Sequence, residues 1–195
     1  MAFKELFGIL AVVAGLTSFL PYLRDIFRKK TTPHIYSWLV WSILQITGVI
    51  AMISGDAGYG SLGLAMGALV SIVVFILAFK YGTRNITKFD TVCLIGALVA
   101  ILVWIFQKDA FYSVILITVI DFVGFLPTYR KGYFEPNSET AMLYFMSAVS
   151  NIFAILSIAN YSVVTTLYVA SLVATNGFIV TLLLVRRRMR RTLSF

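Results

Sequence analysis

The stretch FLPYLR at residues 19–24 returns later in the chain as FLPTYR at residues 125–130, at a constant offset of 106 residues. A further proline follows each copy, Pro33 in the first case and Pro136 in the second. These two matching pairs account for all four prolines of the chain. Chance would not place every proline in matching positions, so this spacing predicts an internal duplication.

The ends of two apolar stretches keep the same offset. Lys80 closes one of them and Arg186 closes the other, again 106 residues apart. We therefore predict a first three-helix unit at residues 1–82 and a second at residues 109–195, with a linker helix at residues 83–108. Both units are expected to begin on the same side of a membrane, so they are parallel repeats related by an axis along the membrane normal.

The composition is that of an integral membrane protein. Of the 195 residues, 60% are apolar and 12% are charged, and the mean hydropathy is +0.93. A soluble domain has about half apolar and a quarter charged residues, so a soluble enzyme and a disordered chain are excluded. The single cysteine, Cys93, excludes an internal disulfide and a cysteine metal cluster.

Seven apolar stretches are each long enough to cross about 30 Å of hydrocarbon as a helix. The predicted fold class is therefore all-α, with seven transmembrane helices in a 3+1+3 arrangement. The stretches are 6–23, 35–54, 59–79, 91–106, 111–129, 140–159 and 161–185.

The positive charges predict the orientation in the membrane. Of the 16 Lys and Arg residues, 14 follow the first, third, fifth and seventh stretches, and only Lys4 and Lys108 lie on the other side. The positive-inside rule then places the N-terminus outside and the C-terminus in the cytoplasm, in the plasma (inner) membrane. The Arg-rich tail at 186–191 is either a topological anchor on anionic lipid or a docking site for an acidic partner.

This layout resembles the SWEET and PQ-loop transporter superfamily. The resemblance rests on the 3+1+3 order, the outside N-terminus, the stretch Ser18-Phe19-Leu20-Pro21 and the basic loop at 28–32. The family's Pro-Gln pair reads Pro21-Tyr22 here and Pro127-Thr128 in the second unit. The resemblance implies alternating access between two three-helix units, and Ala51 near the family's pocket tryptophan argues against a sugar.

Asp121 is the only acidic residue well inside a predicted span. A carboxylate at the midplane costs about 2.5–3.5 kcal/mol on insertion scales. We expect it either to couple a proton or contact a substrate, or to be a protonated side chain bound to a neighbouring helix.

Other polar residues reach a similar depth and predict a central pocket that binds substrate, with two aromatic rings on its cytoplasmic side. The alternative is hydrogen bonding between helices. The predicted pocket residues are Gln45, Ser71, Asn151, Thr175 and Asn176, with the aromatic residues Trp41 and Tyr144.

Two prolines lie near the cytoplasmic ends of equivalent helices. Proline removes a backbone hydrogen bond within a helix. Pro21 and Pro127 are therefore either hinges of an inner gate or the residues that end these helices.

The function that the sequence favours is transport of a small polar solute, with proton coupling and passive facilitation both open. The alternative is a seven-helix receptor or sensor, without retinal because residues 161–185 contain no lysine. We expect no enzymatic activity, cofactor or metal. The expected partners are the solute and membrane lipid rather than nucleic acid, and the sequence is compatible with a homo-oligomer.

Overall fold

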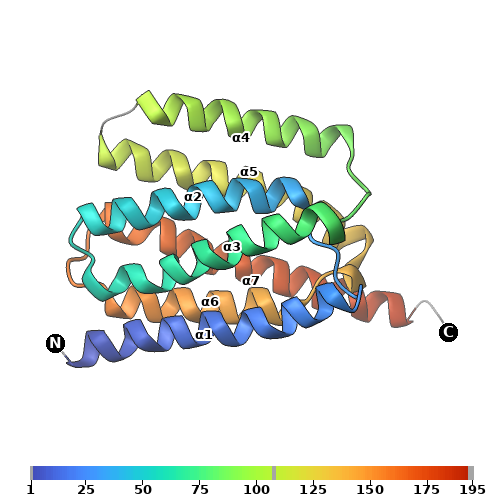
Figure 1. Ribbon diagram of the computed structural model, residues 1–195, viewed down its shortest axis with the longest axis horizontal. Coiled ribbons are helices and arrows are strands. Elements are labelled where there is room, and N and C mark those ends of the chain that lie inside the picture. Colours follow the sequence, from blue (N-terminus) through green and yellow to red (C-terminus); the bar gives the residue numbers. More distant parts are fainter. Residues whose placement is uncertain (1, 107–108, 193–195) are drawn as a thin grey trace.

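The structure is a computed structural model that describes residues 2–106 and 109–192. Within these residues the chain forms seven α-helices and two short 3₁₀ helices, which run back and forth along one common direction (Figure 1). The all-α prediction with seven helices is confirmed for the described residues. The helices are α1 (Ala2–Phe27), α2 (Ile35–Ser54), η1 (Gly58–Gly60), α3 (Ser61–Tyr81), α4 (Lys88–Phe106), α5 (Ala110–Phe134), η2 (Pro136–Ser138), α6 (Ala141–Ser157) and α7 (Val163–Thr192).

Five of these helices are long and apolar enough to cross a membrane, which makes the chain a multi-pass membrane protein. They are α1, α2, α3, α5 and α7. The apolar helix α6 has 17 residues, at the lower end of the range for a span, and α4 has 19. Large apolar side chains such as Leu20, Ile50 and Ile76 are more than half exposed, as expected for a surface that faces lipid.

We call α1, α2 and α3 the first group of helices and α5, α6 and α7 the second, in their order along the chain. In the first group α3 contacts both α1 and α2, and in the second α7 contacts both α5 and α6. The groups meet where α1 packs on α6 and where α2 packs on α5. Helix α4 lies at the edge of the bundle against α5, as Figure 1 shows, and also contacts α2.

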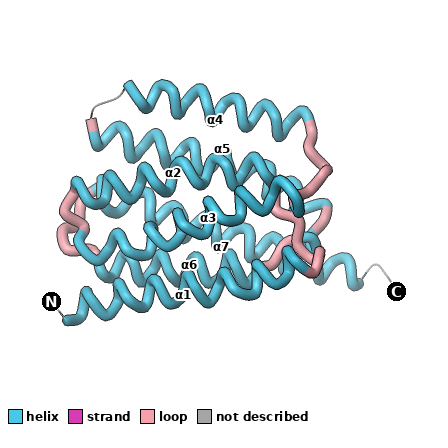
Figure 2. Tube along the Cα trace, viewed as in Figure 1, coloured by secondary structure: helices cyan, strands magenta, loops and turns pink. Residues whose placement is uncertain are grey.

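The loops divide between two ends of the bundle (Figure 2). Residues 28–34, 82–87 and 135–140 lie at the same end as the last turns of α7, and we call this the basic end. Residues 55–60 and 158–162 lie at the opposite end.

Three helices end at least four residues beyond the apolar stretches predicted for them. Helix α1 runs to Phe27, α5 to Phe134 and α7 to Thr192, so basic residues counted as loop residues extend the helices. Positive side chains near a helix C-terminus are favoured by the helix dipole. Pro21 and Pro127 therefore lie inside helices, and the interpretation that they end them is wrong.

Candidate functional site

A cavity lies between the two groups of helices. Its volume is about 60 Å³, enough for a few water molecules. Each α-helix except α4 contributes to its lining. The lining residues are Gly15, Ser18, Trp38, Trp41, Gln45, Gly63, Gly67, Val70, Ser71, Phe125, Leu143, Tyr144, Ser147, Ser150, Asn151, Leu172 and Asn176.

The structure brings six of the seven predicted pocket residues to this cavity. Thr175 is the exception, because it lies in a shallow apolar groove between α5 and α7. Its hydroxyl bonds the Ser171 carbonyl within α7 at 3.1 Å, and its carbonyl accepts a hydrogen bond from Tyr129 Oη at 3.1 Å. The six residues at the cavity are Trp41, Gln45, Ser71, Tyr144, Asn151 and Asn176.

Two asparagines present amide groups at the cavity. Asn151 Nδ2 donates to the Ser147 carbonyl and Asn176 Nδ2 donates to the Leu172 carbonyl, each at 2.8 Å. Each side chain is thus held by a backbone carbonyl one turn earlier in its own helix. Neither Oδ1 atom has a hydrogen-bond partner among the described residues, so both are acceptors that a solute could engage.

Gln45 depends on a glycine for its position. Its Nε2 donates to Ser71 Oγ at 2.7 Å, which joins α2 to α3. A Cβ atom at Gly67 would lie 2.1 Å from Gln45 Oε1. Any side chain at residue 67 would therefore displace the end of Gln45 from this place.

Aromatic rings form one wall of the cavity. The rings of Trp38 and Trp41 meet edge to face with centroids 5.0 Å apart, and the Phe125 ring lies 4.5 Å from that of Trp41. Such pairs add about 0.5–1.5 kcal/mol beyond the burial of their area. The sequence did not single out Phe125 for the pocket, although it begins the repeated FLP stretch.

Asp121 is fully buried but does not line the cavity. It lies one turn before Phe125 on α5, with Oδ1 3.5 Å from the hydroxyl of Tyr168 on α7. Its Oδ2 has no hydrogen-bond partner within the described part of the chain. No ion pair to Asp121 is found there either, so an ionised carboxylate at this place would be a buried charge without a counter-ion.

The two groups of helices touch at both ends of the bundle. At the opposite end, Ala159 N donates to the Ala57 carbonyl at 3.0 Å, and a Cβ atom at Gly60 would lie 2.8 Å from Ile158 Cγ1. At the basic end, Thr32 N donates to the Ser138 carbonyl at 3.2 Å. The two groups are therefore joined by direct contacts at both ends of the bundle.

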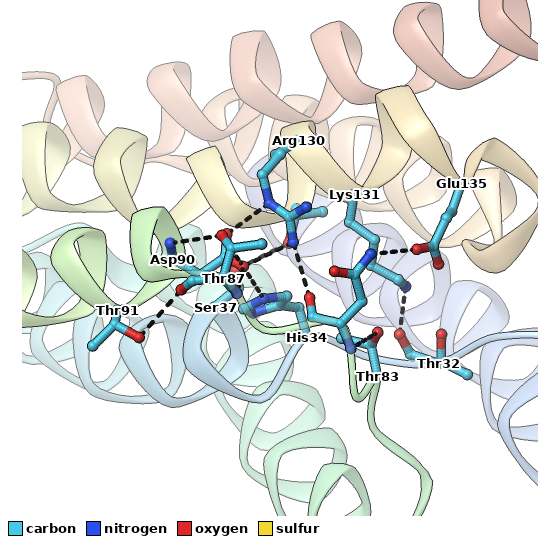
Figure 3. Close-up of polar contacts among 12 residues, drawn as sticks. Thr32, His34, Ser37, Thr83, Thr87, Asp90, Thr91, Arg130, Lys131 and Glu135 are labelled. Atoms are coloured by element: carbon cyan, nitrogen blue, oxygen red, sulfur yellow. Dashed lines mark hydrogen bonds and ion pairs between the residues drawn. The ribbon is translucent and has the colours of Figure 1, made fainter.

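A second polar cluster at the basic end attaches α4 (Figure 3). Arg130 donates to both carboxylate oxygens of Asp90, at 2.9 and 2.8 Å. Asp90 also accepts from Thr87 N at 2.8 Å, and its own N–H reaches Thr87 Oγ1, which is the reciprocal capping arrangement of a helix N-terminus. This single carboxylate therefore both caps α4 and binds α5.

His34 completes this cluster at the start of α2. It is fully buried, with Nε2 3.4 Å from Asp90 Oδ2, and neither ring nitrogen makes a hydrogen bond within the described residues. Burial lowers the pKa of His34 from 6.5 to about 4, against the opposing effect of the Asp90 charge. His34 is therefore neutral at physiological pH.

Comparisons of this chain with family models, curated proteins and solved structures find no match. The chain is thus described as a seven-helix, all-α multi-pass membrane protein, within residues 2–106 and 109–192.

Proposed function

We propose that this protein is a transporter that carries a small polar solute by alternating access between its two groups of three helices. The observation that carries the proposal is the cavity, because side chains from both groups line it and meet around it. A site shared between two bundles can be exposed to either side by rocking one bundle against the other.

The arrangement of helices supports a repeat of three-helix units. In each group the third helix contacts the first two, as α3 does with α1 and α2 and as α7 does with α5 and α6. This order fits the sequence repeat and the proposed relation to the SWEET and PQ-loop superfamily. Pro21 and Pro127, inside α1 and α5, would serve as hinges, because each lacks the N–H that closes a helical hydrogen bond.

The lining of the cavity favours an uncharged solute. It contains amides, hydroxyls and aromatic rings but no Asp, Glu, Lys, Arg or His among the described residues. A charged solute would lose its hydration there without gaining a counter-charge. Because the cavity has about 60 Å³, it must widen when a solute larger than a few waters binds.

The test is counterflow in liposomes that contain the purified protein, with a panel of labelled sugars, nucleosides and neutral amino acids. Asn176→Ala should lower the rate for the transported solute about tenfold, since it removes one hydrogen-bonding group from the cavity. The matched control is Asn160→Ala, because Asn160 is exposed at the opposite end. If no solute exchanges while the protein is folded, a receptor or sensor becomes the better description.

Gly67→Ala should lower counterflow by a similar factor with little loss of stability. The new methyl group displaces the flexible end of Gln45 rather than backbone, so it breaks the bond to Ser71 and narrows the cavity. Gly177→Ala is the control, because a Cβ atom there meets nothing within 4 Å. Parent-like counterflow in Gly67→Ala would contradict the role given to Gln45.

We further propose that Asp121 couples transport to a proton. The isosteric change Asp121→Asn should abolish the dependence of counterflow on pH, because an amide, unlike a carboxyl group, does not bind and release a proton. The comparison is Asp56→Asn, which changes an exposed carboxylate at the opposite end. If Asp121→Asn keeps the pH dependence of the parent, transport is not coupled through this residue.

A further inference from the structure

A buried ion pair lies where the two groups of helices meet at the basic end. Lys131 on α5 is fully buried, and its Nζ donates to Glu139 Oε1 at 2.6 Å and to the Ser138 carbonyl at 3.1 Å. Its third hydrogen bond goes to the carbonyl of Thr32, in the loop that follows α1. All three ammonium hydrogens are therefore used, and one of them joins the second group of helices to the first.

The second carboxylate oxygen of Glu139 accepts a hydrogen bond from a residue that lines the cavity. Tyr144 lines the cavity on α6, and its hydroxyl donates to Glu139 Oε2 at 3.0 Å. Tyr144 and Glu139 are exposed by only 2% and 3%. A continuous chain of hydrogen bonds thus runs from the cavity wall through Tyr144, Glu139 and Lys131 to Thr32.

A second contact between the two groups of helices at the basic end involves Asp25 on α1. Asp25 precedes Lys131 by 106 residues, the offset of the sequence repeat, so the two occupy equivalent places in α1 and α5. Asp25 Oδ2 accepts from Thr140 Oγ1 at 3.0 Å, and the Thr140 and Thr31 hydroxyl oxygens lie 2.5 Å apart. Each of the equivalent residues, Asp25 and Lys131, therefore reaches across to the loop of the other group.

We infer that Tyr144, Glu139 and Lys131 link occupancy of the cavity to opening of the basic end. This inference rests on the proposed function and assigns its regulation to named residues. A solute that accepts the hydrogen bond of the Tyr144 hydroxyl takes one of the contacts that hold the Glu139 carboxylate. Glu139 then positions Lys131 less firmly, and the contact of Lys131 with Thr32 between the groups weakens. The three side chains are positioning residues for the contact that closes the basic end.

The experiment measures distances across each end by electron spin resonance in lipid nanodiscs. Spin labels are attached to cysteines at Arg28 and Asn137 for the basic end, and in a separate sample at Asp56 and Asn160 for the opposite end. All four residues are exposed, and Cys93→Ser removes the native thiol. The variants are Lys131→Met, which removes the bond to Thr32, and Tyr144→Phe, which keeps the ion pair and removes only the hydroxyl.

Both variants should lengthen the mean distance at the basic end by several ångströms and leave the opposite end unchanged. Lys80→Met and Tyr161→Phe are the controls and should match the parent, because both residues lie outside the chain of bonds. Tyr144→Phe decides the matter if Lys131→Met does not fold. An unchanged basic-end distance in Tyr144→Phe overturns the inference, even if the protein transports a solute. A lengthened distance supports the inference, and counterflow tests separately whether the protein transports a solute.

Discussion

Replacing Arg130 by methionine is expected to lower the free energy of unfolding by about 3–5 kcal/mol. Asp90 is fully buried and would lose two charge-assisted hydrogen bonds from the guanidinium at once. The remaining carboxylate would keep its bonds to Thr87 but no cationic partner, since His34 is neutral. The measurement is equilibrium unfolding of the purified protein in detergent by denaturant.

The control for Arg130→Met is Arg24→Met at the same end of the bundle. Arg24 also binds a carboxylate with its guanidinium, that of Asp25, but its side chain is 57% exposed. Exposed pairs contribute about 0–1 kcal/mol, so this variant should unfold nearly as the parent does. Equal losses of stability in the two variants would show that burial of Asp90 does not decide the strength of its pair.

A second large effect is expected from acid. The free energy of unfolding should fall by about 3 kcal/mol through His34 alone as the pH drops from 6.5 to 4. Because the folded-state pKa of His34 is about 4, the unfolded chain binds a proton in this range while the folded protein does not. Protonation then favours the unfolded state, so the free energy of unfolding falls as the pH drops below 6.5.

His34→Gln isolates this contribution from that of the carboxylates. Glutamine does not titrate, so the difference in unfolding free energy between parent and variant should change with pH by about 3 kcal/mol between pH 6.5 and 4. The carboxylates common to both proteins largely cancel in that difference. A difference that stays constant over this range would mean that His34 keeps an ordinary pKa in the folded protein.

Sequence reasoning located most helices because long apolar runs bounded by charge leave few alternatives. It placed the helix ends too early, as at Phe27 and Phe134, because hydropathy stops at the first basic residue whereas backbone hydrogen bonding does not. For the same reason Lys131 was counted as a loop charge, although it is fully buried.

The cavity could be predicted in part, because polar side chains at mid-depth of an apolar helix avoid lipid. The depth of a residue along its helix does not show, however, to which side of the helix its side chain points. Thr175 and Asn176 are adjacent, so their side chains diverge by about 100° around α7. Asn176 reaches the cavity while Thr175 faces the groove beside α5. Asp121 shows the same limit, since it lies one turn before Phe125 on α5 but is packed against Tyr168 and does not line the cavity.

The attachment of α4 through Arg130 has a consequence for the order in which the protein assembles during synthesis. Helix α3 contacts both α1 and α2, so these three helices can pack as soon as they are made. Asp90, by contrast, forms its bidentate ion pair with Arg130, a residue 40 positions later in the chain. We therefore expect α4 to remain loosely held until α5 has emerged from the ribosome, and the two to settle into the bundle as a pair.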